Sequence, residues 1–89
     1  MSGQSTITRQ GELIPAVVAD RLRRLRREAG LNRDALARET GISRRSIVMH
    51  ERGNVTGIRA DFLCRYADVF GVSTDYILGR TDERSGTDG

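Results

Sequence analysis

The sequence predicts an all-α fold, a compact bundle of five short helices. Its 89 residues are enough for one small domain with a single core. Apolar residues recur at helical spacing between residues 15 and 79, with no alternating strand pattern and no internal repeat. The chain has only one proline, and a glycine follows each of the first four apolar segments. Short helices with tight connections are typical of a bundle.

The first helix is expected to begin near Pro15, which tolerates the first turn because the missing N–H needs no partner there. Gly30 ends it. Its buried face is expected to carry the apolar residues found three or four positions apart, which are Val18, Leu22, Leu25 and Ala29.

Two shorter helices follow, each with a capping residue and a terminating glycine. Asn32 is a good N-cap for residues 33–40, and Gly41 ends that segment. Ser43 caps a helix that runs to about Arg52. The side chains expected to face inward here are Leu36, Ala37, Thr40, Ile42, Ile47 and His50.

The last two helices are expected from about Arg59 to Phe70 and from Ser73 or Thr74 to about Leu78. Their inward residues are expected to be Leu63, Ala67, Phe70, Ile77 and Leu78, with Cys64 as a small buried hydrophobe. These helices complete a domain over residues 15–79. Residues 1–14 are expected to be a polar, flexible arm, and residues 80–89 are expected to be a disordered tail.

Positive charge is concentrated in the middle of the chain. Residues 21–60 hold eleven arginines against four acidic residues, a net charge of +7, whereas residues 1–20 carry −1 and residues 61–89 carry −3. Every basic residue is arginine, which forms planar bidentate contacts with phosphate and guanine. A GC-rich genome would also explain the missing lysine. The asymmetry itself indicates a polyanionic partner, with nucleic acid as the leading candidate.

Other classes of function fit poorly. No apolar run approaches the roughly 18 residues that cross a bilayer, and nothing suggests secretion. We therefore expect no membrane partner and a cytoplasmic location. One cysteine and one histidine are too few donors for a structural zinc site of Cys and His ligands, and we expect no cofactor. No paired carboxylates, nucleophile motif or phosphate-binding glycine loop is visible, which argues against an enzyme.

One stretch matches the spacing of a helix-turn-helix, in which two short helices are joined by a turn that contains glycine. Ala37 lies four residues after Arg33, where the helices cross closely and only a small side chain fits. Gly41 lies another four residues on, in the turn, where a positive φ is easiest for glycine. Ile47 and His50 then face the partner helices. Agreement at all these positions specifically indicates a helix-turn-helix.

The segments RLRRLRREAGLNRDALA, GISRRSI, ERG and FGVSTDYILG are the most specific pieces of residues 21–79. On these pieces, the chain resembles the XRE or Cro/repressor-type helix-turn-helix family. That resemblance implies a lambda-repressor-like five-helix domain, a double-stranded DNA operator as partner and a homodimer on DNA. It also implies that residues 43–52 form the helix that enters the major groove.

The resemblance assigns base contacts to the exposed side of that helix, at Arg44, Arg45, Ser46 and Met49. The commonest specific contact of arginine is bidentate to guanine N7 and O6, so G·C pairs are expected in the half-site. Met49 stands where many relatives carry a polar or basic residue, and it offers only an apolar contact, for instance to a thymine methyl.

Phosphate contacts are expected where helices begin and after the recognition helix, because free N–H groups at a helix start bind phosphate oxygens. The expected residues are Asn32, Arg33, Ser43, Arg52, Asn54 and Arg59. Arg33 replaces the usual glutamine of the family, which leaves its contact geometry open. A neighbouring minor groove is the alternative target of Arg59.

Two further expectations concern the core. In the family, the arginine of the first helix commonly pairs with the glutamate of ERG, which implies a structural ion pair between Arg26 and Glu51. Such a pair fixes geometry more than it adds net stability. His50 takes a position usually filled by an apolar side chain, and we expect it to pack in the core rather than to serve chemistry.

Two functions follow from these observations. The first is a sequence-specific DNA-binding transcription regulator, most simply a repressor of the Cro-like or phage-derived type. The alternative is an antitoxin or interaction adaptor of the same fold, whose N-terminal arm binds a protein partner by adding a strand to its sheet. The operator, the sign of regulation and the dimer surface are not fixed by the sequence.

Overall fold

The computed structural model describes residues 16–53 and 57–85, and within them the chain is entirely helical or irregular. The helices are α1 (Ala16–Glu28), α2 (Arg33–Thr40), α3 (Arg44–Arg52), α4 (Ala60–Phe70) and α5 (Thr74–Ile77). This confirms the all-α prediction. The expected helix limits agree to within about two residues, the ordinary uncertainty of helix ends. The predicted arm, residues 1–14, and Asn54 lie outside the described residues.

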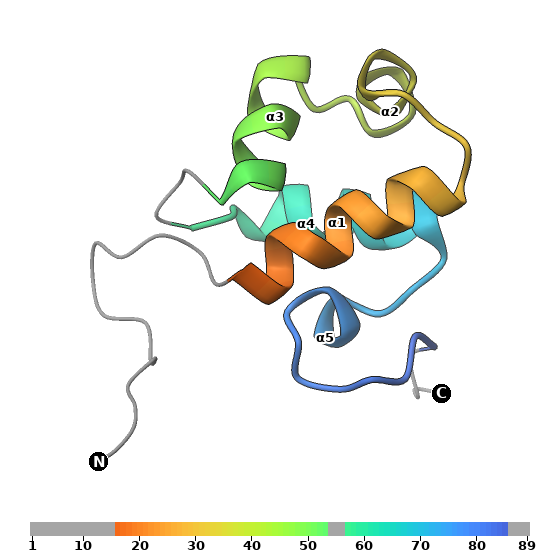
Figure 1. Ribbon diagram of the computed structural model, residues 1–89, viewed down its shortest axis with the longest axis vertical. Helices are drawn as coiled ribbons and strands as arrows, with labels where there is room; N and C mark the ends of the chain where they lie inside the picture. The colour runs from red at the N-terminus through yellow and green to blue at the C-terminus, as the bar shows by residue number, and fades with distance from the viewer. Residues whose placement is uncertain (1–15, 54–56, 86–89) are drawn as a thin grey trace.

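Helix α1 runs through the middle of the domain, with α2 and α3 at one end and α5 at the other (Figure 1). It packs against α3, α4 and α5, while α2 packs against α3 and α4. The α2–α3 pair therefore presents one end of the domain to solvent. None of the helices in the described ranges is long and apolar enough to span a bilayer.

The core is built from side chains of every helix and of the turn between α2 and α3. Six apolar side chains lose essentially all contact with water: Leu22, Leu36, Ile42, Ile47, Tyr66 and Ile77. Full burial of an aliphatic side chain contributes about 1.5 to 3 kcal/mol each, so these residues dominate the packing energy. They also fix the position of α3, because Ile42 and Ile47 lie at its start and on its inner face.

Three residues expected in the core are exposed instead: Ala29, Leu78 and Cys64. Ala29 follows the last residue of α1 and Leu78 follows the last residue of α5, so neither continues the buried face of its helix. Cys64 lies two positions before the buried Tyr66, which places it roughly on the opposite side of α4. Leu63 and Phe70 are only partly buried.

Helices α2, α3 and α5 begin as their sequences predict. The side-chain oxygens of Asn32, Ser43 and Ser73 accept hydrogen bonds from backbone N–H groups three residues on, at 2.7, 3.1 and 3.0 Å. Each such cap contributes about 0.5 to 2 kcal/mol to the helix it starts. The caps therefore define where α2 and α3 expose their free N–H groups.

The described part of the C-terminal segment differs from the expected disordered tail. Residues 80–85 form no helix, but Arg21 Nη1 on α1 donates to the carbonyls of Tyr76 and Thr81, at 2.6 and 2.7 Å. Both terminal nitrogens of Arg84 donate to Glu28, at 2.7 and 3.1 Å. These contacts come from long side chains rather than from apolar residues, so composition alone gave no sign of them.

Candidate nucleic-acid interface

The turn between α2 and α3 sets the angle of the two helices. Gly41 has a φ of 75°, in the left-handed region that favours glycine. The hydroxyl of Thr40 donates to the carbonyl of Leu36 at 2.7 Å and accepts from the N–H of Ile42 at 3.1 Å. Leu36 and Ile42 are fully buried beneath the turn. The hydrogen bonds of Thr40 and the burial of Leu36 and Ile42 therefore fix the conformation of the turn.

Glu51 ties α3 to the rest of the domain. Its side chain is 1% exposed, and its carboxylate forms a bidentate ion pair with Arg26 of α1, at 2.7 Å from Nε and 3.1 Å from Nη2. Arg26 also donates to the carbonyl of Leu31 at 3.0 Å. The two residues that the resemblance paired thus form a buried structural contact, which leaves Arg26 no free edge toward solvent.

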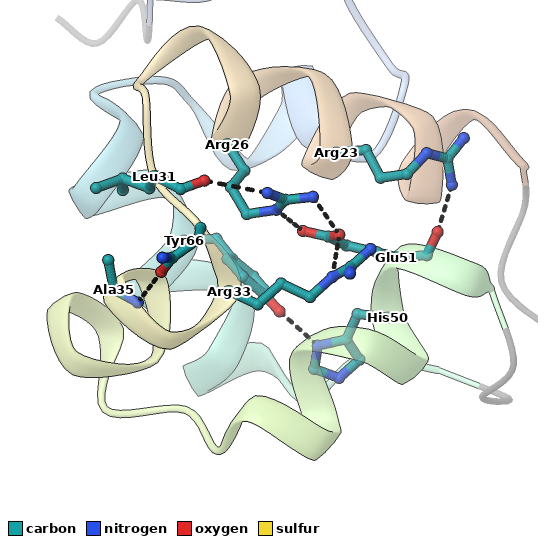
Figure 2. Close-up of polar contacts among 9 residues, drawn as sticks. Arg23, Arg26, Leu31, Arg33, Ala35, His50, Glu51 and Tyr66 are labelled. Atoms are coloured by element: carbon teal, nitrogen blue, oxygen red, sulfur yellow. Dashed lines mark hydrogen bonds and ion pairs between the residues drawn. The ribbon is translucent and has the colours of Figure 1, made fainter.

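A second arginine reaches the same carboxylate. Arg33 Nε donates to Glu51 Oε1 at 3.0 Å, and Arg23 Nη1 donates to the backbone carbonyl of Glu51. Figure 2 shows these arginines converging on Glu51 from α1 and α2. The sequence suggested Arg33 only as a phosphate contact. Its side chain keeps 34% exposure, so it lies between the buried carboxylate and solvent.

His50 holds the inner face of α3 against α4. It is buried, and its Nδ1 lies 2.7 Å from the hydroxyl of Tyr66, within hydrogen-bonding distance (Figure 2). Burial lowers the pKa of His50 and raises the pKa of Tyr66, so the folded domain favours the neutral form of both side chains. The histidine packs in the core, and the Tyr66 hydroxyl is a partner that the sequence did not indicate.

The outer face of α3 carries the residues to which the resemblance assigns base contacts. Arg44 and Arg45 are exposed in the first turn, and Ser46 and Met49 are half-buried. Arg44 Nε forms an ion pair with Asp34 of α2 at 3.0 Å. This contact shows that the starts of α2 and α3 lie next to each other. Arg45 has no ion pair with any residue within 16–53 or 57–85.

The hydroxyl groups of Ser43 and Ser46 are engaged with each other at the start of α3. The Ser43 hydroxyl donates to the Ser46 hydroxyl at 3.0 Å, while its oxygen also accepts from the Ser46 N–H. Asn32 is similarly occupied by capping α2. Asn32 and Ser43 shape the helix starts, and the first backbone N–H groups of α2 and α3 that these caps do not engage are the part left to meet an anion.

The remaining arginines of the expected phosphate set are exposed but differ in their partners. Arg52 lies at the C-terminal end of α3. Arg59 precedes α4 and forms a bidentate contact with Asp61, at 3.0 and 3.2 Å, over the ring of Phe62. A phosphate would have to displace Asp61 to be bound by the same edge of Arg59.

The resulting arrangement is suited to binding a polyanion. Two capped helix N-termini lie side by side, and positive dipole ends favour negative charge. Arg44 and Arg45 project from the same end of the domain, with Arg33 one helix away. No cluster of three or more potential metal ligands occurs in the part of the chain that the structure describes.

Comparison with known proteins agrees with this geometry. A family model described as "Helix-turn-helix domain" matches residues 19–83. Among solved structures, the chain is similar to the N-terminal DNA binding domain of SinR from Bacillus subtilis, with 25% identity and a TM-score of 0.68. That match covers 72% of this chain and 93% of the other. A search of curated proteins gave no match. The chain belongs to the XRE-type helix-turn-helix family.

Proposed function

We propose that this protein is a sequence-specific transcription regulator that binds double-stranded DNA by placing α3 in the major groove. The observation that carries the proposal is the exposed pair Arg44 and Arg45 at the start of α3, beside the start of α2. A helix-turn-helix presents the N-terminal residues of its second helix to base edges. The similarity to a solved DNA-binding domain supports the same orientation.

Base reading is assigned to Arg44 and Arg45. The Arg45 guanidinium is exposed and is not held by an acid of the described chain, so its planar fork is available to guanine N7 and O6. Ser46 and Met49 lie further along the same face, where Met49 offers an apolar surface to a thymine methyl. The half-site should therefore contain G·C pairs opposite the first turn of α3.

Phosphate contacts are assigned to the starts of α2 and α3 and to the arginines around them. Asn32 and Ser43 cap helices whose first N–H groups have no partner within the helix. Arg33 uses Nε for Glu51, which leaves its terminal nitrogens for a phosphate. Arg52, Arg59 and Asn54 complete the proposed set. Such contacts position the protein without selecting a sequence.

We further propose a homodimer on a two-fold symmetric operator, because helix-turn-helix domains read two half-sites about 34 to 36 Å apart. Binding of this kind excludes other proteins from the same base pairs, which favours repression over activation. Sedimentation of the protein with and without an operator duplex would show two protomers per duplex. One protomer per symmetric duplex at saturation would refute the dimer.

The test of sequence-specific binding is a comparison of a selected duplex with a shuffled one. The selected duplex comes from several rounds of enrichment with the wild-type protein, and both affinities are measured from 50 to 300 mM salt. We expect both to weaken by about 0.9 log unit per log unit of salt for each phosphate neutralised, with the selected duplex keeping an advantage throughout. Equal affinity for the two duplexes at every salt concentration would refute the proposal.

Variants locate the interface. Arg44→Ala combined with Arg45→Ala should abolish the preference for the selected duplex. Arg80→Ala is the matched control, since Arg80 is an exposed arginine three residues after α5, and α5 lies at the end of the domain away from α3 (Figure 1). A loss of preference in the control equal to that in the double variant would place the interface elsewhere.

A further inference from the structure

An acidic side chain lies within the face proposed to meet DNA. Asp34 is the second residue of α2, its side chain is 66% exposed, and its carboxylate lies 3.0 Å from Arg44 Nε. A carboxylate near phosphates weakens DNA binding by repulsion. Stabilising the positive end of α2 is one reason for an acid at this position. That stabilisation does not explain why the Asp34 carboxylate contacts Arg44 on the neighbouring helix α3.

The contact meets Arg44 at one side of its guanidinium. Arginine has five N–H donors in a rigid plane, and bidentate recognition of guanine uses two of them. Asp34 engages Nε, the nitrogen nearest the backbone. The terminal nitrogens Nη1 and Nη2 reach further from α3 and remain available for N7 and O6. The ion pair thus restricts the side chain without consuming its reading edge.

We propose that Asp34 is a positioning residue that sets the base specificity of Arg44. It would hold the guanidinium near its reading orientation before DNA arrives, so that less side-chain freedom is lost on binding. An exposed ion pair adds little to the stability of the fold. Its effect should therefore appear in discrimination between bases rather than in unfolding. This inference rests on the proposed function, because it concerns how α3 reads DNA.

Removing the charge of Asp34 should lower the preference for guanine without weakening the affinity for DNA in general. Asp34→Asn should bind a shuffled duplex as tightly as the wild type or more tightly, because one repulsive charge is gone. It should also lower the preference for guanine at the base pair read by Arg44 by about 3- to 10-fold, or about 0.7 to 1.4 kcal/mol. A purely structural role would instead weaken binding to all duplexes alike.

The experiment uses the full chain and two duplexes. One is the selected duplex, and the other carries adenine in place of the guanine whose preference disappears in Arg44→Ala. The affinity ratio is measured for the wild type, Asp34→Asn, Arg44→Ala and the double variant. We expect Asp34→Asn to lower the ratio in the wild-type background and to leave it unchanged in the Arg44→Ala background.

Asp75→Asn is the matched control. Asp75 is also the second residue of its helix and lies near an arginine, Arg80, at 4.0 Å, but α5 is at the other end of the domain. It should leave the ratio as in the wild type. The inference is overturned if Asp34→Asn keeps the wild-type ratio, or lowers it equally in the Arg44→Ala background. If the wild type itself does not discriminate the selected from the shuffled duplex, the proposed function fails first.

Discussion

The carboxylate of Glu51, near the end of α3, is 2.7 Å from Arg26 Nε on α1, and both side chains are almost completely removed from water. Arg33 of α2 is a second partner of this carboxylate, at 3.0 Å. One buried carboxylate thus connects the three helices that position the proposed DNA-binding face. Replacing such a cluster by apolar residues can be neutral, but removing one charge leaves the others unpaired.

Glu51→Gln should therefore destabilise the domain strongly. The amide leaves Arg26 buried without a counter-charge, and we expect a loss of about 3 to 5 kcal/mol in the free energy of unfolding. Urea titration followed by circular dichroism measures it. Glu39→Gln, on the exposed side of α2, is the control and should stay within about 0.5 kcal/mol of the wild type. A loss under about 1 kcal/mol for Glu51→Gln would contradict this reading of the cluster.

The two arginines on Glu51 should differ in their effects. The Arg26 side chain is 11% exposed and that of Arg33 is 34% exposed, so solvent screens the second pair more. Arg33→Met should lower the free energy of unfolding by about 1 kcal/mol or less and weaken binding to every duplex alike. Arg26→Met should cost several times more stability. Urea unfolding compares the stability of the two variants, and titration with the selected and shuffled duplexes measures their affinity for DNA. A larger loss of stability in Arg33→Met than in Arg26→Met would contradict the ranking of the two ion pairs.

His50 should make stability depend on pH. Desolvation lowers the pKa of His50 below its ordinary value of 6.5 in the folded state. Below that value the unfolded chain takes up a proton that the folded chain excludes, so stability should be full above about pH 7 and fall as the pH drops toward 5. Each unit by which the pKa of His50 differs between the folded and the unfolded chain corresponds to about 1.4 kcal/mol of stability.

Urea unfolding of the wild type and of His50→Phe between pH 7.5 and 5 measures this contribution. The variant loses the contact with Tyr66 and should be less stable at neutral pH, so the slope is the quantity to compare. We expect a flatter slope in His50→Phe. The same slope in both proteins would assign the pH dependence to other groups.

Arg21 should hold the C-terminal segment and α5 on α1. Its guanidinium donates to two carbonyls and lies 4.2 Å from the centre of the Tyr76 ring. Arg21→Met keeps most of the aliphatic stem but removes these contacts, and we expect a loss of about 1 to 3 kcal/mol with faster amide exchange in α5. Arg24→Met is the control, because Arg24 is exposed and pairs only with Asp20 among the described residues. Unchanged exchange in α5 would contradict this role.

The sequence predicted the features that depend on local spacing. Asn32 and Ser43 were identifiable as caps because a capping side chain is short and polar and stands three residues before the N–H from which it accepts a hydrogen bond. Gly41 was identifiable as the turn residue because the turn needs a positive φ. The inward positions of Leu36 and Ile47 follow from helical periodicity in the same way.

Apart from the pair of Arg26 and Glu51, which the resemblance implied, the sequence did not predict which acid each arginine meets. Arg33 reaches Glu51 eighteen residues away, Arg44 reaches Asp34, and Arg84 reaches Glu28 across 56 residues. Each choice depends on how two helices or segments cross, and a long arginine side chain can reach several acids. The same reason explains why the contacts of residues 80–85 were missed, because polar composition favours disorder unless specific partners lie within reach.

If the first turn of α3 reads bases, the base preference of Arg45→Ala must differ from that of the wild type. Sequences bound by the wild type, by Arg45→Ala and by Arg80→Ala are selected from one random duplex pool at one salt concentration. We predict that Arg45→Ala loses its preference for guanine at one base pair of each half-site, by about 1 to 3 kcal/mol, and that Arg80→Ala keeps the wild-type pattern. A wild-type pattern in Arg45→Ala, with affinity lowered equally for all sequences, would show that Arg45 contacts phosphates and does not read a base.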